Sequence, residues 1–341
     1  MAATDPSKYE KLLIQSSDGS KTADIRLGAL GIEYYEDIFS PTITAKIMVT
    51  NTGDTIKDSD GSLQSLYNGF PLRGGERIRM KIGGNTADNP GLDFDSEPSK
   101  YLYVSGITQV LKKAQSESFV LNLFSREAIT NETSRVGCKF SSSSPISETV
   151  KDIVKKYLKS DKLSDDNVEP TENPYGFIGN MRKPFTVLTW LASKSVPGTG
   201  KGKSSTAGYL FFQTKDGFVF KSIDGLISAK PFKKSYFYQE VIQGGNSNND
   251  YNITRYSTNY NQDLVGQLKR GAFCSHTMFL HPVTFNYTPY DDGLFKFEDY
   301  AGKTATLGKK PKLPSISEED ERSLGDVPSR NMTAILDIGT V

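Results

Sequence analysis

The chain has 341 residues, enough for one large hydrophobic core or for two to three smaller ones. Its 41 Lys and Arg residues offset 40 Asp and Glu residues, so the net charge of +1 gives no sign of a nucleic-acid or acidic-membrane partner. No apolar run approaches about 18 residues, MAATDPSKYEKLL lacks the pattern of a secretory signal, and two cysteines are too few for a disulfide framework. We expect a soluble protein without a membrane anchor, assembled in a reducing cytoplasm.

The first part of the chain reads as strands, because apolar residues alternate with polar ones between turn-forming residues. The clearest case is 41–52, where Ile43, Ala45, Ile47 and Val49 share one face. Six strands are predicted, at 11–17, 23–38, 41–52, 77–82, 101–111 and 117–125. Loops are predicted at 53–70 and 83–99. This pattern, in a chain with 19 Phe, 17 Tyr and a mean hydropathy of -0.45, favours an antiparallel barrel or sandwich whose surface takes part in assembly.

The middle of the chain changes to helical spacing. Helices are predicted at 125–136 and 144–160, and in the second Ser144 is the expected N-cap with Pro145 as the first helical residue. A third helix begins at Pro184 and ends near 195. Its expected apolar face consists of Phe185, Leu188, Trp190, Leu191 and Ala192.

A glycine-, lysine- and serine-rich loop to residue 206 then leads into a strongly aromatic hairpin at 208–223, with Asp216-Gly217 at its turn. We interpret helix, loop and hairpin as the join between two domains. Further strands are predicted at 273–290, 293–300 and 331–341, with an exposed linker over 301–330. The last strand is expected to be an edge strand, or to belong to a chain that continues past Val341.

Few residues invite a chemical role. His276 and His281 fall on opposite faces of one predicted strand, while Cys274 and His276 share a face, so a weak Cys/His site is conceivable there. Strand residues of these types are usually structural, and Cys138 is expected to be a small packed residue. The sequence contains no GxSxG, P-loop or HExxH motif, and no strand-linked GxGxxG motif.

Two further polar features are interpreted as structural. The glycine pair of LRGGERIRM (72–80) leads into a strand, and it predicts a tight turn that places Glu76 and Arg77 at a barrel rim. The paired carboxylates Asp58 with Asp60, and Asp291 with Asp292, lie in polar loops that lack the full ligand ladder of a calcium site. We therefore predict no catalytic, cofactor-binding or metal-binding residues, no cofactor and no enzymatic activity.

Several segments, in this order, resemble the baseplate hub proteins of contractile-tailed bacteriophages and related injection machines. The first are IEYYEDIFSPTITAKIMVTNTGD (32–54), FPLRGGERIRMKI (70–82) and the strands over 101–136, which resemble the first tube-like barrel of that family. SPISETVKDIVKKYLKS, NMRKPFTVLTWLASKSV and GYLFFQTKDGFVFKSI resemble its helical insertion and the start of its second barrel. The resemblance covers about residues 10–230, and it is carried by the order of the motifs.

The resemblance implies an α+β, mainly β fold: two tail-tube-like antiparallel β barrels with a helical insertion between them. It implies a first barrel at 8–136, a helical insertion at 137–206 and a second barrel, with loop insertions and possibly incomplete at its C-terminus, at 207–341. It also implies a homotrimer that forms a pseudo-hexameric ring in the tail baseplate of the virion, assembled in the host cytoplasm. The implied partners are the central spike protein, the tail tube or tube-initiator protein, baseplate wedge proteins and the tape-measure protein in the lumen.

Two alternatives remain open at this stage. A carbohydrate- or receptor-binding tail protein would use tyrosines of the stretches 251–260 and 285–290, Tyr287 and Tyr290 among them, to stack on sugars. A hydrolase would use Cys274 and His276. For the hub reading we expect no sequence-specific nucleic-acid partner.

Overall fold

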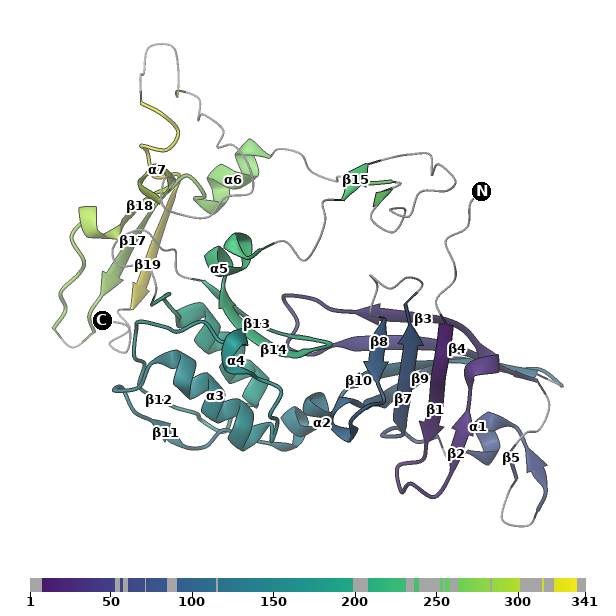
Figure 1. Ribbon diagram of the computed structural model, residues 1–341. Coiled ribbons are helices and arrows are strands. Elements are labelled where there is room, and N and C mark those ends of the chain that lie inside the picture. The colour runs from purple at the N-terminus through teal and green to yellow at the C-terminus, as the bar shows by residue number, and fades with distance from the viewer. Residues whose placement is uncertain are drawn as a thin grey trace.

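A computed structural model describes residues 8–52, 56–57, 61–70, 72–84, 91–114, 116–198, 208–230, 236–238, 252–253, 255–257, 263–282, 284–300, 315 and 322–335. The molecule is α+β and mainly β, as predicted (Figure 1). A strand-rich unit occupies one end, the helices α3 and α4 pack beside the β13–β14 hairpin in the middle, and a small sheet of β17, β18 and β19 lies at the far side (Figure 1). None of the described helices is long and apolar enough to cross a membrane.

The strand-rich unit is one antiparallel sheet of eight strands in the order β2-β1-β7-β9-β10-β4-β3, with β8 paired to β7. Its buried side chains form the first core, to which most of the strands contribute. The strands are β1 (Lys8–Gln15), β2 (Thr22–Asp24), β3 (Ala29–Tyr35), β4 (Thr44–Thr52), β7 (Arg77–Gly83), β8 (Leu92–Phe94), β9 (Leu102–Lys112) and β10 (Ser116–Ser125). The alternation predicted for β4 is confirmed, because Ile43, Ala45, Ile47 and Val49 are all at most 3% exposed.

A short 3-10 turn, η1 (Arg26–Gly28), joins the two edge strands of this sheet. The Ile25 amide next to it donates to the carbonyl of Leu12 on β1, at 3.0 Å. Gly28 at its other end lies against β4, where an added Cβ would come within 2.3 Å of the Thr50 carbonyl oxygen. The turn therefore contacts β1 and β4, the strands next to the two edge strands, and so curls the sheet towards a barrel. It also divides the stretch 23–38, which the sequence predicted as one strand.

The two predicted loops of this unit contain short elements. The first holds β5 (Ile56–Lys57), β6 (Leu63–Gln64) and α1 (Leu66–Gly69), and the second holds β8 and η2 (Pro98–Lys100). Phe94 of β8 is 2% exposed and packs in the first core. The prediction of plain loops was wrong here, since runs of two to four residues are too short to show a period.

The second core lies between the helices and the aromatic hairpin. Helices predicted at 125–136, 144–160 and 184–195 are confirmed as α2 (Arg126–Thr133), α3 (Ile146–Tyr157) and α4 (Pro184–Lys194), and the predicted hairpin as β13 (Tyr209–Thr214) with β14 (Gly217–Ser222). Shorter elements around this core are β11 (Lys139–Phe140), η3 (Asp165–Asn167) and β12 (Phe177–Ile178).

Two details of these helices differ from prediction. Pro145, not Ser144, is the N-cap of α3, and no side chain caps the helix there. Trp190 was predicted on the buried face of α4, but it is 36% exposed and Val187, at 2%, takes the buried position. Trp190 instead packs edge-on against Tyr175 and Phe177, which cover only part of the indole.

The last third of the described chain forms short elements and small sheets. They are α5 (Ile223–Ser228), β15 (Phe237–Tyr238), β16 (Asn252–Ile253), α6 (Leu264–Arg270), β17 (Cys274–Leu280), η5 (Asp291–Gly293), β18 (Leu294–Lys296), α7 (Phe297–Tyr300) and β19 (Arg330–Ile335). The predicted strands at 273–290 and 293–300 are shorter than expected, and the second of them ends in α7. Strand β19 pairs in parallel with β17 and lies at the edge of this sheet.

The division into domains at 136/137 and 206/207, and the second barrel, stay predictions. The strands after residue 207 form three separate small sheets within the described ranges. The hairpin β13–β14 also shares its core with α3 and α4, so residues on both sides of 206/207 belong to one hydrophobic cluster.

Candidate functional site

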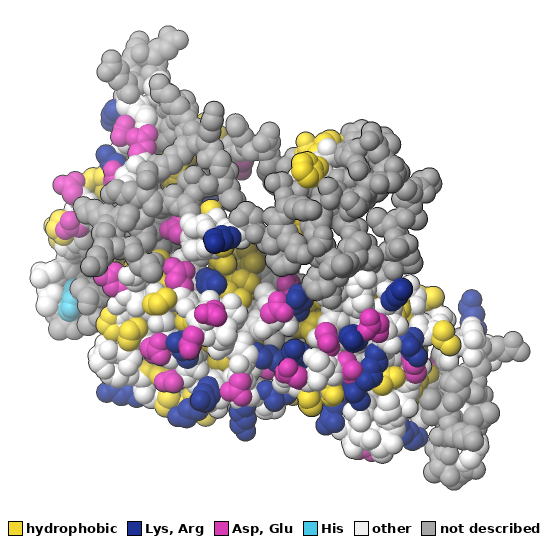
Figure 2. Space-filling model, in the orientation of Figure 1, with side chains coloured by type: hydrophobic (Ala, Val, Ile, Leu, Met, Phe, Trp, Pro, Cys, Tyr) yellow, Lys and Arg dark blue, Asp and Glu magenta, His cyan; other side chains and the backbone are white. Residues whose placement is uncertain are grey.

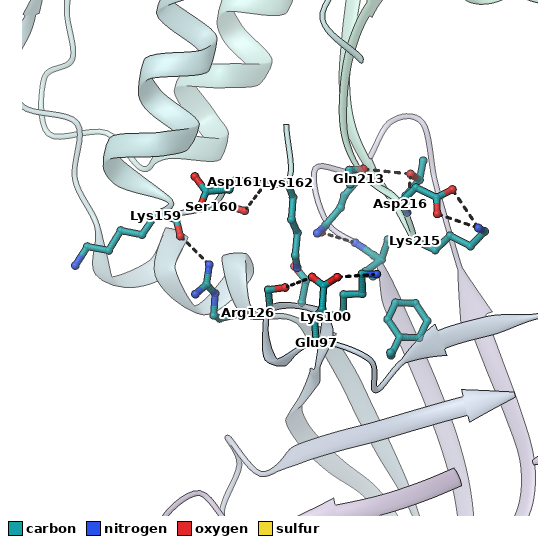
Figure 3. Close-up of a pocket in the computed structure, with 16 residues that line it drawn as sticks. Glu97, Lys100, Arg126, Lys159, Ser160, Asp161, Lys162, Gln213, Lys215 and Asp216 are labelled. Carbon is teal, nitrogen blue, oxygen red and sulfur yellow. Dashed lines mark hydrogen bonds and ion pairs between the residues drawn. The ribbon is translucent and has the colours of Figure 1, made fainter. Parts of the chain in front are cut away.

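A cleft of about 430 Å³ lies between the strand-rich unit and the helices (Figure 3). Three segments supply most of its wall: the β10–α2 junction at Ser125 and Arg126, the segment 159–162 after α3, and the hairpin tip 213–217. Residues 97–100 of η2 form part of the rim. The cleft therefore lies where the two cores meet.

A fully buried carboxylate, Glu127, anchors one wall of the cleft. It accepts a hydrogen bond from the Ser160 hydroxyl at 2.8 Å, and the Lys162 ammonium lies 3.0 Å from its other oxygen. Arg126 contacts it at 3.4 Å and donates to the Lys159 carbonyl at 2.7 Å (Figure 3). Glu127 lies in the first turn of α2, which follows directly on strand β10. This network therefore ties the C-terminal end of β10 to the segment after α3.

The charge of Glu127 is held by its partners. Burial raises the pKa of its carboxyl, but the charge and hydrogen bond of Lys162 and the Ser160 hydroxyl outweigh burial, so the pKa lies below its ordinary value. The residue is thus ionised at neutral pH, although its side chain is 0% exposed. A buried carboxylate of this kind depends on each of its partners.

On the other wall of the cleft, the hairpin tip forms hydrogen bonds with the strand-rich unit. The side-chain oxygen of Gln213, which is 1% exposed, accepts from the Ile43 amide at 3.3 Å. The Lys215 amide donates to Glu36 at 2.6 Å, and Glu36 also accepts from the Tyr34 hydroxyl at 2.7 Å. The β3–β4 connection therefore reaches the hairpin, as the ribbon view shows (Figure 1).

Gly217 closes the same wall by close backbone approach. The Phe218 amide donates to the Lys162 carbonyl at 2.8 Å. Gly217 has a φ of 134°, and an added Cβ would come within 2.2 Å of that carbonyl oxygen. Only glycine fits both the backbone conformation and the contact. These contacts connect the two cores, while the predicted join between two domains stays a prediction.

The polar side chains of the cleft connect the strand-rich unit to the helices and the hairpin. Of the cations that line the cleft, Arg126 and Lys162 contact Glu127, and Lys215 pairs with Asp216 at 3.0 Å. Ser160 donates its proton to a carboxylate whose pKa is lowered, and such a carboxylate is a weak base at neutral pH. The arrangement therefore holds two units together and supplies no activated nucleophile.

A second surface lies on the outside of the strand-rich unit. Strand register places Gly31, Met48, Val120 and Thr108 in one row across β3, β4, β10 and β9, on the face opposite the first core. Met48 (38%) and Leu111 (65%), which pairs with Ser118, are exposed on this face, and Leu30 (70%) and Val110 (37%) are exposed at the register shifts of β3 and β9 beside it. We call these four side chains the outer barrel face. Lys, Arg, Asp and Glu are mixed over the part of the molecule seen in Figure 2, without a patch of one sign.

The Cys274/His276 pair does not form a site. Cys274 is 0% exposed, and burial raises the pKa of its thiol, which disfavours the reactive thiolate. His276 stacks on Tyr290 with ring centroids 4.4 Å apart, and His281 accepts from the Thr284 amide at 3.2 Å. No group of three His, Cys, Asp or Glu side chains is placed to hold a metal ion in the part of the chain that was searched, which is the described part.

The remaining residues singled out from the sequence are dispersed. Glu76 is fully buried at the predicted glycine turn, where its carboxylate accepts from the Arg73 and Gly74 amides at 2.6 and 3.1 Å. Asp291 and Asp292 begin η5, while Asp58 and Asp60 lie outside the described residues.

The tyrosines of the sugar-binding alternative are exposed, Tyr287 at 69% and Tyr290 at 56%. Cys138 is half-buried and accepts a hydrogen bond from Tyr157 at 3.1 Å, consistent with a packed thiol.

Sequence reasoning missed Glu127 and Lys162. The available signal was an acid placed immediately after the apolar run of 117–125. That position is buried only because the segment 160–162 folds over it, a contact between residues 33 to 35 positions apart.

Known proteins offer only distant likenesses to this arrangement. No protein-family model matches the chain, and no curated protein matches it by sequence. Among solved structures, the 43 kDa tail protein of prophage MuSo2 from Shewanella oneidensis is 14% identical with a TM-score of 0.43, over 68% of this chain and 59% of that one. The tail protein from Neisseria meningitidis MC58 is 11% identical with a TM-score of 0.47, over 97% and 72%. Prophage tail protein gp18 from Listeria monocytogenes EGD-e is 9% identical with a TM-score of 0.43, over 96% and 73%.

Two of these three structures are named as prophage tail proteins and the third as a tail protein, and the chain spans 59% of the length of the Shewanella protein. With TM-scores below 0.5, these likenesses carry no inference about the function of this chain.

Proposed function

We propose that this chain is a non-enzymatic structural protein of a phage tail, the central baseplate hub subunit of a contractile tail. In this role three copies form a pseudo-hexameric ring that adapts the three-fold central spike to the six-fold tail tube. The proposed partners are the spike, the tube or its initiator, the wedge proteins and, in the lumen, the tape-measure protein. The ring would later admit the genome during ejection.

The observation that carries the proposal is the outer barrel face. Met48 and Leu111 are exposed on β4 and β9, on the face of the sheet opposite the first core, and Leu30 and Val110 are exposed at the register shifts beside them. Exposed apolar side chains gathered in this way mark contact surfaces. The order of sequence motifs that resembles the hub family supports the same role, and the paired charges of the cleft support a structural one.

The test measures assembly of the full chain. Light scattering of the purified protein is expected to give the mass of three chains of 37.6 kDa each, and electron micrographs are expected to show a three-fold ring with an open centre. The double variant Leu30→Glu with Leu111→Glu places charges on the outer barrel face, and we expect it to be monomeric. Phe285→Glu is the matched control, because Phe285 is 77% exposed and lies outside that face.

A single-chain mass at micromolar concentration, with the spike protein also failing to bind, would overturn the proposal. A trimer that withstands the double charge variant would overturn the part played by the outer barrel face, because another surface would then hold the copies together.

A second candidate, a carbohydrate- or receptor-binding tail protein, draws on one observation. Tyr287 is 69% exposed and therefore offers a ring face for stacking on a sugar. Binding of the isolated protein to a glycan array, abolished by Tyr287→Ala and Tyr290→Ala, would favour this candidate over the hub.

A further inference from the structure

An apolar surface that the hub role does not use lies beside strand β12 and helix α4. It belongs to the part of the molecule built around the second core, which we call the helical unit. Ile178, Met181 and Trp190 are 59%, 65% and 36% exposed there. Ile178 and Trp190 line a cavity of about 160 Å³. We call this cavity the Trp190 pocket. The residues that line it include Phe177, Ile178, Arg182, Thr186, Val187 and Trp190.

The aromatic wall of the pocket is held in place from behind. The Trp190 ring packs edge-on against Tyr175 and Phe177, with centroids 5.3 Å away in both cases. Phe177 in turn stacks on Phe140 at 4.6 Å. Because these contacts fix the indole before anything binds, a partner loses little conformational entropy in using it.

The apolar side chains beside the indole are presented by a fixed loop. Gly179 lies against Val136, where an added Cβ would come within 2.3 Å of the carbonyl oxygen. The Gly179 amide donates to the Cys138 carbonyl at 3.0 Å, and the Val136 amide donates to the Arg182 carbonyl at 2.9 Å. The backbone that carries Ile178 and Met181 is thus tied on both sides, so their exposure is part of the packed structure.

A cation, Arg182, is among the residues that line the pocket. Arg182 is exposed, and its guanidinium forms no ion pair with a carboxylate of the described residues. The neighbouring Lys183, by contrast, is paired with Glu132. An unpaired guanidinium at the rim of an apolar pocket is suited to a carboxylate, which it can bind through two parallel hydrogen bonds.

Size decides between the possible occupants. A cavity of about 150 Å³ accommodates a benzene-sized group, so the Trp190 pocket has room for one apolar side chain. A stable dimer buries about 800 Å² on each partner through roughly 20 residues or more, which this small surface does not provide. A single inserted side chain with a charged neighbour fits the surface better than a second copy of the chain.

We propose that the Trp190 pocket binds a segment of another protein that inserts one apolar side chain and places a carboxylate on Arg182. The aromatic wall supplies the contact area, and Arg182 sets the orientation of the segment and excludes basic ones. The surface lies on the helical unit, so the proposal does not depend on the ring formed through the outer barrel face.

The probe is a library of random heptapeptides displayed on a surface and selected against the immobilised full chain. Trp190 is the only tryptophan in the sequence, so its fluorescence reports binding of each synthesised hit at the pocket itself. We expect hits in which an apolar residue neighbours Asp or Glu, and a shift of the Trp190 emission to shorter wavelength. Affinity should fall more than tenfold in Trp190→Ala and about tenfold in Arg182→Gln.

Lys155→Gln, at an exposed position of α3, is the control, and it should bind as the wild type does. Ile178→Ala changes a side chain that is 59% exposed, so it keeps the test decisive if Trp190→Ala does not fold. It should lower affinity several-fold.

Three outcomes would overturn the proposal. The first is that the selected peptides bind Ile178→Ala as tightly as they bind the wild type. The second is a set of apolar hits without acidic residues that bind Arg182→Gln equally well. The third is self-association of the chain that Ile178→Ala abolishes, which would make a second copy the occupant.

Discussion

The two hydrophobic cores are built in different ways. The first draws its strands from one continuous stretch, 8–125, and each strand carries its own alternation of buried and exposed residues. The second consists of α3, α4 and the hairpin β13–β14, and a glycine-rich stretch of sequence separates the hairpin from α4. The buried carboxylate of Glu127 and the close backbone contact of Gly217 lie at its border. Local pattern thus places the long strands of the first core, while the second depends on a few contacts between distant residues.

The hairpin β13–β14 has a part in both units. Phe211, Phe218 and Phe220 are at most 3% exposed and fill the second core, while Gln213 and Lys215 hydrogen-bond to the strand-rich unit. A change in the hairpin interior should therefore weaken the second core more than the first. The sole tryptophan lies on the second core, so its fluorescence follows that unit, whereas far-ultraviolet circular dichroism includes the barrel strands.

The largest effect is expected from Phe218→Ala. Phe218 is 0% exposed and stacks on Phe211 at 5.2 Å, so the variant leaves a cavity in the second core. We expect a loss of about 3–5 kcal/mol in the unfolding free energy measured in urea by Trp190 fluorescence. Phe119→Ala, in the first core, is the matched change. Equal shifts of the fluorescence and dichroism transitions in both variants would show that the two cores unfold as one unit.

Next in size is Lys162→Met. It leaves Glu127, which is 0% exposed, without its cation, and breaking a buried pair in this way costs about 3 kcal/mol. Urea unfolding of the variant should show that loss, and Lys155→Met, at an exposed position of α3, should be close to neutral. If Lys162→Met proved as stable as the control, the network at the cleft would not hold the second core to the barrel.

Gly217→Ala should have a somewhat smaller effect. The new methyl group must occupy a φ of 134° and meet the Lys162 carbonyl oxygen, so we expect about 2 kcal/mol of destabilisation and a shifted hairpin tip. The control is Gly106→Ala in β9, where an added Cβ has open space. Comparable thermal unfolding of the two variants would contradict the close approach of hairpin and segment 160–162.

The smallest effect concerns pH. The pKa of Glu127 is lower in the folded chain than its ordinary value of 4.5, so the folded state binds fewer protons than the unfolded state. Its stabilisation is complete above pH 4.5 and is lost as the pH falls through the folded pKa. Glu127→Gln should therefore be less stable than the wild type at pH 7, by about 1 kcal/mol, and should lose less stability on acidification. Parallel pH profiles of stability would refute this role of Glu127.

Elements with a sustained period were predictable. Strand β4 and helices α3 and α4 appear within a few residues of their predicted positions, because seven or more consecutive residues repeat one pattern. Helix α6 was missed although Asp263 caps its start and Gly271, with a φ of 73°, ends it, since seven residues in a polar stretch give little periodic signal. Trp190 was misplaced because helical spacing does not show that Tyr175 and Phe177 cover only one side of the indole.

The cleft and the Trp190 pocket were less accessible to prediction. Both are made by side chains and backbone groups that are far apart in the sequence, such as Ile43 with Gln213, or Val136 with Gly179. Each residue looked unremarkable in its own segment. The glycines at 179 and 217 carried a signal, yet their purpose became clear only from the carbonyl oxygens that approach them.

The sequence alone established a mainly β chain with helices in its middle, the buried faces of its long strands and the aromatic hairpin, since alternation and helical spacing are local properties of the chain. The packing of the folded molecule settled which core the hairpin completes, how Glu127 keeps its charge without solvent, and which side of Trp190 stays uncovered. Those features depend on contacts between residues that are far apart in the sequence, so no local pattern shows them. Burial and charge pairing stabilise such residues only after folding has brought them together.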